Sequence, residues 1–147
     1  MKIILVFLAF AMIYAPSDVS LAAGKEDRES KNKSQGSCVT NFSGRGFRML
    51  DMKSKKASSW QTFEGISYDQ AFRKVAQATA KRGWTNMDSN KELGTVTAGL
   101  PGSAISIVVE EQGSIIRVEA TMDLQSSSFS EKAAKETICV SVEAPGR

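Results

Sequence analysis

The side chains that most often carry out enzyme chemistry are sparse in this sequence. There is no histidine, which excludes His-based triads, histidine general bases and histidine metal ligands. Glu110 and Glu111 are adjacent, but neighbouring residues of a strand point to opposite faces and cannot form a two-carboxylate pair. Glu119 and Asp123 would share a strand face roughly 13 Å apart, too far for a glycosidase pair. A solvated strand surface explains these carboxylates better than catalysis.

Serine chemistry without histidine would need a lysine as the base. The Ser-x-x-Lys spacing from Ser30 to Lys33 falls in a polar segment where nothing would hold the pair in place. Ser130 precedes a predicted helix, so N-capping explains it. We therefore expect no enzyme activity and no cofactor.

Cys38 and Cys139 are the two cysteines of the chain. In an oxidising compartment we expect a disulfide between them, tying the start of the domain to its last element. Closing a loop of about 100 residues stabilises a fold by up to ~4.7 kcal/mol in the chain-entropy model. The alternative is two free or intermolecular thiols. Two thiolates alone cannot complete a tetrahedral zinc site, so we expect no metal.

A basic and aromatic group of residues is the best candidate for a partner-facing site. These residues could together bind an anionic polymer or lipid. The group consists of Arg45, Arg48, Lys53, Lys55, Lys56 and Trp60. The alternative is an entry loop followed by core aromatics. The formal charge of +3 is mild, so nucleic acid is not expected as a partner, whereas weak attraction to anionic surfaces is.

Residues 1–22 have the pattern of a secretory signal peptide. Lys2 is followed by the apolar run Ile3–Tyr14, then Pro16, and Ser20 and Ala22 suit the −3 and −1 positions of a cleavage site. The run is shorter than the ~18–20 apolar residues that span a bilayer. The sequence therefore predicts an exported protein, periplasmic or secreted.

Residues 23–37 contain almost no apolar side chain, which predicts a flexible leader before a single domain at 38–147. Within that domain the clearest element is a helix over Tyr68–Arg82. Ser67 is its expected N-cap, and Gly83 is the expected left-handed residue after its end. A second helix is expected from about Ser130 to Glu143, with a strand as the rival over its end.

Alternating apolar residues predict strands at Gly94–Leu100, Ile105–Glu111 and Ile115–Leu124. Shorter strands are expected at Phe47–Met52 and Trp60–Phe63. The basic stretch Lys53–Ser59 is expected to be a hairpin loop, and Asp88–Glu92 a turn-rich connection. This order predicts an α+β fold, in which helices pack on one face of an antiparallel sheet as a two-layer sandwich. Its exposed sheet face would carry Arg117, Glu119, Thr121 and Asp123.

Three short segments carry a family resemblance: Gly65–Phe72, Arg82–Trp84 with Asp88, and Glu92–Ala98. Together they resemble small exported bacterial envelope proteins with a helix-grip-like α+β domain, distantly similar to domains of an outer-membrane barrel-assembly lipoprotein. The resemblance implies a fold and carries over no functional residue. The chain lacks the lipidated cysteine with which such lipoproteins begin.

These observations favour an exported, non-catalytic protein that binds or scaffolds an envelope protein or lipid. One alternative is a secreted inhibitor of a hydrolase such as lysozyme, with a protruding loop at Lys53–Ser59 or Leu100–Ala104. The other is a small-ligand or lipid carrier, with a pocket between helix and sheet near Phe72, Trp84 and Met122.

Overall fold

The computed structural model describes residues 34–47, 54–125 and 129–147 of the chain. The predicted signal peptide and most of the predicted leader lie outside these residues. Along the described chain the elements are β1 (Ser34–Gln35), β2 (Ser43–Arg45), β3 (Lys55–Glu64), α1 (Tyr68–Lys81), β4 (Thr85–Asn90), β5 (Thr95–Leu100), β6 (Ser103–Gln112), β7 (Ile115–Leu124), α2 (Glu131–Val142) and the 3-10 turn η1 (Ala144–Gly146).

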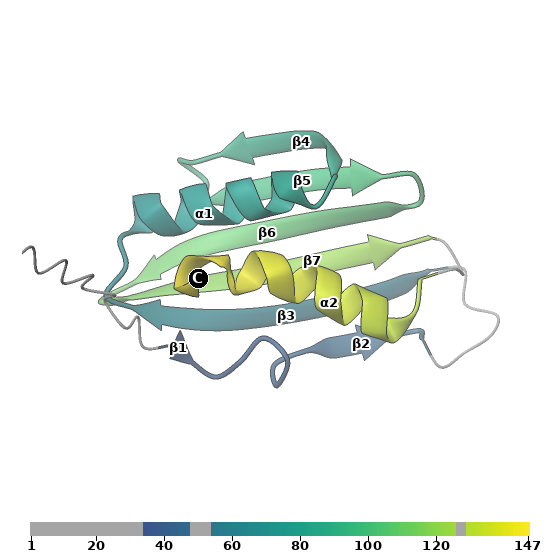
Figure 1. Ribbon diagram of the computed structural model, residues 1–147, viewed down its shortest axis with the longest axis horizontal. Helices are drawn as coiled ribbons and strands as arrows, with labels where there is room; N and C mark the ends of the chain where they lie inside the picture. Colours follow the sequence, from purple (N-terminus) through teal and green to yellow (C-terminus); the bar gives the residue numbers. More distant parts are fainter. Residues whose placement is uncertain (1–33, 48–53, 126–128) are drawn as a thin grey trace, which may run out of the picture.

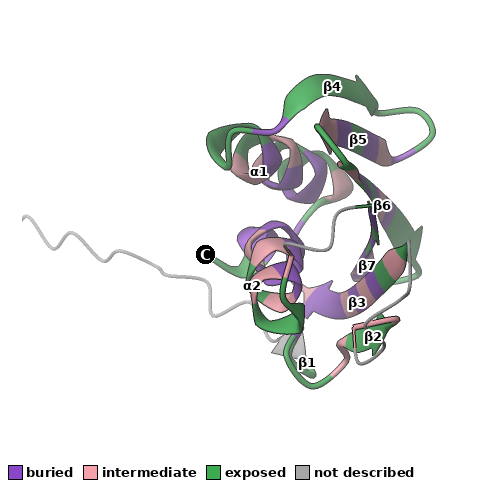
Figure 2. Ribbon diagram, turned by 90° about the vertical axis from the view of Figure 1, so that its right-hand side faces the viewer, coloured by how far each residue is buried: buried purple, intermediate pink, exposed green. Residues whose placement is uncertain are grey.

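The strands of the described chain form one antiparallel sheet in the order β1-β3-β7-β6-β5-β4, and β2 also pairs with β3. Both helices lie on the same face of this sheet (Figure 1). Figure 2 shows that the sheet curves around them, so that one face is concave and covered and the other is convex and open. The α+β two-layer prediction is confirmed.

Helix α1 begins and ends where the sequence predicts. The Ser67 hydroxyl accepts a hydrogen bond from the main-chain N–H of Gln70 at 3.3 Å, which satisfies one of the donors left free at a helix start. Gly83 follows the C-cap with a φ of +78°, the left-handed conformation that glycine adopts without steric cost. The buried side of the helix is a stripe formed by Ala71, Phe72, Val75 and Thr79.

Helix α2 also starts at its predicted cap. The Ser130 hydroxyl accepts a hydrogen bond from the N–H of Ala133 at 3.1 Å. The helix continues to Val142, so the rival strand at its end is wrong. Ala134, Ile138 and Val142 lie on the sheet side, fully buried at the helical spacing of four residues. No helix in the described ranges has the length and apolar character needed to cross a membrane.

Strand β3 corrects one expectation. Lys55–Ser59 is not a loop but the first half of this ten-residue strand. The residues of this half that face the concave side of the sheet are Ala57 and Ser59, both small and buried. Because they are not large apolar residues, the sequence shows only a weak alternation of apolar and polar side chains there. Residues 48–52 of the expected strand Phe47–Met52 lie outside the described chain, and Phe47 lies in a turn after the short strand β2.

Strand β4 is the second correction. The sequence predicts a turn at Asp88–Glu92, but Thr85–Asn90 pairs with β5 and a turn follows only at residues 91–94. All its residues are exposed, because it is an edge strand that buries neither face. The pairing shifts register between Thr85 and Asp88, and irregularity of this kind is common at sheet edges.

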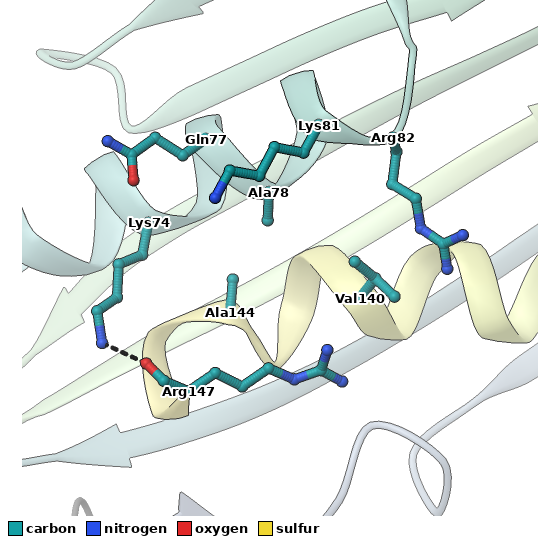
Figure 3. Close-up of a pocket in the computed structure, with 8 residues that line it drawn as sticks. All are labelled: Lys74, Gln77, Ala78, Lys81, Arg82, Val140, Ala144 and Arg147. Atoms are coloured by element: carbon teal, nitrogen blue, oxygen red, sulfur yellow. Dashed lines mark hydrogen bonds between the residues drawn. The ribbon is translucent and has the colours of Figure 1, made fainter.

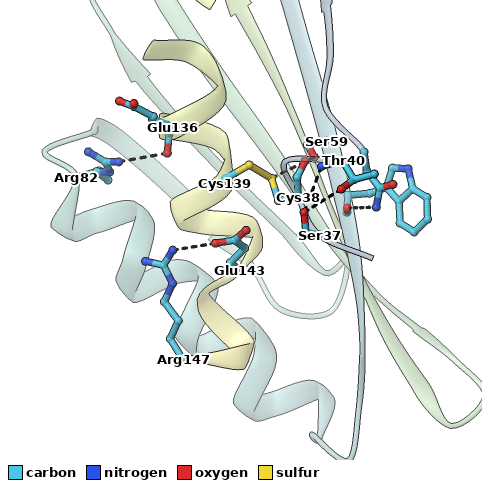
Figure 4. Close-up of a disulfide and its surroundings, with 11 residues drawn as sticks. Ser37, Cys38, Thr40, Ser59, Arg82, Glu136, Cys139, Glu143 and Arg147 are labelled. Atoms are coloured by element: carbon cyan, nitrogen blue, oxygen red, sulfur yellow. Dashed lines mark hydrogen bonds and ion pairs between the residues drawn. A yellow bond between two sulfur atoms is a disulfide. The ribbon is translucent and has the colours of Figure 1, made fainter. Parts of the chain in front are cut away.

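The N-terminal segment of the described chain packs on the edge of β3. Ser34 and Gln35 pair with Phe63 and Thr62, so the packed part of the chain begins within the segment predicted as leader. The Cys38 and Cys139 Cα atoms are 5.4 Å apart, and a disulfide joins the two residues (Figure 4). The predicted pairing is therefore found, and it fastens this segment to α2.

The core lies between the helices and the concave face of the sheet. Its large side chains come from strands β3, β6 and β7, from both helices and from the connection after α1, and include Phe63, Phe72, Trp84, Ile105, Ile107, Met122, Leu124 and Ile138. The predicted convex residues of β7 lie opposite them: Thr121 and Asp123 are exposed, and Arg117 and Glu119 are partly exposed. The alternation along β7 thus separates a packed face from an open one.

Candidate functional site

A basic and aromatic surface lies on the convex face, at the edge where β2 meets β3. Arg45 is directly opposite Lys56 in the antiparallel pair, so the two side chains share a face. Lys56 Nζ pairs with Asp123 at 3.3 Å, whereas none of the described residues pairs with Arg45. Like charges directly opposite each other are destabilising in a sheet, so this arrangement would benefit from a bound anion.

Trp60 lies on the same face as Lys56, since it comes four positions after Lys56 along β3. The Arg117 guanidinium lies 4.7 Å from the centre of the Trp60 ring, a cation–π contact that orients both groups. Arg117 also pairs with Glu119 at 2.8 Å. We call Arg45, Lys56, Trp60 and Arg117 the convex patch.

The structure separates Lys55 from this patch. Its neighbours along β3 point to the other face, and its Nζ donates to the Phe129 carbonyl oxygen at 3.1 Å. The same Nζ lies 5.5 Å from the centre of the Phe47 ring. Lys55 therefore links the start of β3 to the segment before α2. Arg48 and Lys53 lie outside the described residues.

A row of hydroxyl groups crosses the convex face beside the patch. In the register of the sheet, Ser58 lies opposite Thr121, Thr121 opposite Ser106, and Ser106 opposite Thr97. Neighbouring rows place Trp60 opposite Glu119 and Lys56 opposite Asp123. The convex face thus offers small polar groups flanked by one aromatic ring and charges of both signs.

A second feature, which the sequence did not reveal, is a groove of about 330 Å³ between α1 and the end of α2. Its residues come from both helices, from η1 and from the residues that directly follow α1 and η1 (Figure 3): Lys74, Gln77, Ala78, Lys81, Arg82, Val140, Ala144 and Arg147. Four of these side chains are cationic, and among the described residues that line the groove none is acidic. We call it the cationic groove.

Hydrogen bonds to main-chain oxygens hold two of these cations in place across the helix pair. Lys74 Nζ donates to the oxygens of Pro145 and Arg147 at 3.1 and 2.7 Å. Arg82 donates to the Glu136 carbonyl at 3.2 Å. Such bonds hold the two side chains in place across the helix pair.

The remaining two cations of the groove differ in their partners. Arg147 pairs with Glu143 at 2.9 Å, so its charge is largely compensated. Lys81 is exposed and has no polar partner among the described residues. Among the described residues, Lys74, Lys81 and Arg82 are therefore the groove cations without an acidic side chain as partner.

A shallower hollow lies at the opposite end of α1, beside the loop after β4. It is lined by Tyr68, Glu92, Leu93, Gly94, Val109, Glu110, Glu111 and Gln112. Burial raises the pKa of the Tyr68 phenol, and the nearby Lys91 ammonium partly opposes this. The Tyr68 hydroxyl donates to the Lys91 carbonyl, so it ties the helix to the loop. Within the described part of the chain, no cluster of three or more acidic or cysteine side chains is placed to hold a metal ion.

The two loops expected for an inhibitor are shorter in the structure than the sequence predicts. Leu100 pairs with Ser103, which leaves Pro101 and Gly102 as a tight turn, and residues 55–59 lie within β3. The residues considered for a carrier pocket are core: Phe72, Trp84 and Met122 are 8, 6 and 0% exposed. Neither alternative gains a site from the positions that suggested it.

No protein-family model matches the sequence, and a comparison with curated proteins finds no match. Among solved structures, the chain is similar to a conserved protein of unknown function, EF2215 from Enterococcus faecalis, with a TM-score of 0.44 and 10% sequence identity. The similarity covers 73% of this chain and 77% of that one.

Proposed function

We propose that this protein is an exported, non-catalytic module that binds a partner in the cell envelope through the convex patch. Export is supported by the signal-peptide pattern of residues 1–22. The disulfide supports it too, because such bonds persist in oxidising compartments.

The observation that carries the binding proposal is the pairing of Arg45 with Lys56 beside the Trp60–Arg117 stack. Two like charges held side by side at a sheet edge are more favourable when an anionic group lies between them. Arginine and tryptophan are also the residues most enriched among those that dominate binding interfaces. We therefore expect an anionic protein surface or lipid headgroup as the partner.

The test is a pull-down from envelope extracts, with proteins and lipids in the eluate identified by mass spectrometry. The variant Arg45→Ser/Lys56→Ser is compared with Arg73→Ser/Lys132→Ser, which removes the same charge from exposed positions of the helix layer. We expect a partner that the first variant loses and the second keeps. Equal capture by both variants, or an eluate without a reproducible partner, contradicts the proposal.

Export is tested separately by cell fractionation and intact mass. Cleavage after Ala22 should leave a chain that begins at Ala23, recovered outside the cytoplasm. A chain that keeps residues 1–22 inside the cytoplasm contradicts export.

A further inference from the structure

We propose that the cationic groove between α1 and α2 binds a small amphiphile, a molecule with an anionic head and an apolar body. This site is separate from the convex patch, since it is built from the helix layer on the other side of the sheet. The two proposals therefore stand or fall independently.

The size of the groove sets the class of ligand. Small-molecule pockets in proteins commonly range from about 300 to 1,000 Å³. A groove of about 330 Å³ is at the lower end of this range, so it suits one head group with a short length of chain. It is too small for a folded partner segment of any length.

The positively charged side chains of the groove favour a ligand with an anionic head group. Lys74 and Arg82 are held across the helix pair by main-chain oxygens, and Lys81 lies between them along α1 without a polar partner among the described residues. Lysine and arginine donate their strongest hydrogen bonds to carboxylate and phosphate oxygens. Because two of the donors are already positioned, a bound anion would order mainly the Lys81 side chain.

The apolar lining at the floor of the groove favours a ligand with an apolar body. Ala78, Val140 and Ala144 contribute the apolar part of the lining, and each carries a small side chain. A ligand with a fully polar body would have to give up hydration against these methyl groups. An apolar chain would be stabilised by covering them, because apolar surface is then removed from water.

A membrane surface fits the groove less well than a single dissolved molecule. The large apolar side chains that are exposed in the described chain are Val39, Met87 and Leu93, and none of them lines the groove. The helix layer therefore lacks side chains that could enter a bilayer beside a bound headgroup.

The experiment is a titration of the purified, disulfide-intact protein with dodecyl phosphate below its critical micelle concentration, followed by amide NMR shifts. Dodecyl maltoside tests a neutral head, inorganic phosphate tests the head alone, and anionic phospholipid vesicles test a surface. We expect saturable shifts around Lys81, Val140 and Ala144 with dodecyl phosphate, and at least tenfold weaker binding of the neutral amphiphile and of phosphate.

Two variants with matched controls locate the site. Lys81→Gln should weaken dodecyl phosphate binding about tenfold, because it removes one charge-assisted hydrogen bond. Ala78→Glu should weaken it further, because it places a carboxylate on the floor. Lys132→Gln and Ala80→Glu make the same changes at exposed positions that do not line the groove, so they should bind as the parent does.

Several results would overturn the proposal. They are equal affinity for dodecyl maltoside, equal affinity for inorganic phosphate, shifts that map to the convex face, and equal weakening by the groove variants and their controls. Binding to vesicles without saturable binding of the dissolved amphiphile would also overturn it, in favour of a surface interaction.

Discussion

Gly94 shows how closely two backbone segments approach in this fold. A Cβ atom at this position would lie 2.3 Å from the Val109 carbonyl oxygen and 3.0 Å from the Tyr68 hydroxyl. The Gly94 carbonyl also accepts a hydrogen bond from the Val109 N–H at 2.8 Å, and its φ of +66° favours glycine. The residue therefore lets the turn after β4 close onto β6 and α1 together.

We expect Gly94→Ala to lower the free energy of unfolding by about 3 kcal/mol, from left-handed strain and the clash combined. The matched control is Gly113→Ala, which has the same φ of +66° but no heavy atom within 4 Å of the added carbon. The control should cost only about 1 kcal/mol. Urea unfolding of both variants measures the difference, and equal losses would show that the close approach is not sterically limiting.

The raised pKa of Tyr68 predicts that the stability of the fold depends on pH in the alkaline range. Burial raises its pKa, so the folded state prefers the neutral phenol. The contribution of the buried phenol to stability is therefore complete below the ordinary tyrosine pKa of about 10 and is lost as pH rises through the raised value.

Tyr68→Phe should remove this loss of stability at alkaline pH. Because the variant also lacks the hydrogen bond to Lys91, it should lower the free energy of unfolding by about 1 kcal/mol at neutral pH. Thermal unfolding from pH 7 to 11 tests both effects; parallel pH profiles for parent and variant would contradict the assignment.

At the level of elements, a buried hydrogen bond joins the two helices. Thr79 Oγ1 donates to the Val75 carbonyl at 2.9 Å and lies 3.2 Å from Ser141 Oγ. A threonine hydroxyl has one proton, so Ser141 must be the donor between the two side chains. The bond fixes the rotation of each helix against the other.

A double-mutant cycle with Thr79→Val and Ser141→Ala should therefore give a coupling energy of about 1 kcal/mol. Each single variant should destabilise the fold, because it leaves a buried partner unsatisfied. As a control, Thr79→Val combined with Ser106→Ala on the convex face should be additive. Additivity within error for the Thr79–Ser141 pair would mean that the helices are coupled by packing alone.

The elements with strong local signals were predictable from sequence. The capping serines Ser67 and Ser130 and the alternation along β7 depend on nearby residues alone. The first half of β3 and all of β4 were not, because their residues are small or polar and are held as strands by pairing with distant partners. Tertiary pairing overrides weak local preference in such segments.

The candidate sites show the same limit. The sequence indicates Arg45, Lys56 and Trp60 only by their residue types, whereas the sheet register places them together and directs Lys55 to the helix side. The cationic groove was missed because its residues come from two helices more than 50 residues apart, which meet at contacts such as Arg82 with Glu136. No spacing within the sequence indicates that proximity.

For the molecule as a whole, the disulfide is the longest covalent constraint. It joins residues separated by 101 positions, and the half-cystine Cys38 is fully buried against Ser59, whose hydroxyl donates to the Cys38 carbonyl at 2.6 Å. Replacing both cysteines by alanine should lower the free energy of unfolding by about 2–4 kcal/mol. Chemical unfolding of the parent with and without reductant provides an independent comparison.

Intact mass under non-reducing conditions tests whether the bridge forms. The oxidised chain should weigh two hydrogens less than the reduced chain, with no disulfide-linked dimer. An unchanged mass, or a dimer lost on reduction, would replace the internal bridge with free or intermolecular thiols.

The bridge also makes most of the domain a covalent ring. All strands from β2 to β7, both turns of the β5–β6–β7 meander, and most of α2 lie between Cys38 and Cys139. A protease that cut the exposed turn at Pro101 and Gly102 would convert the protein into two chains that remain tethered through sulfur. New chain termini could therefore be placed at that turn, and the disulfide would still hold the helix layer to its sheet.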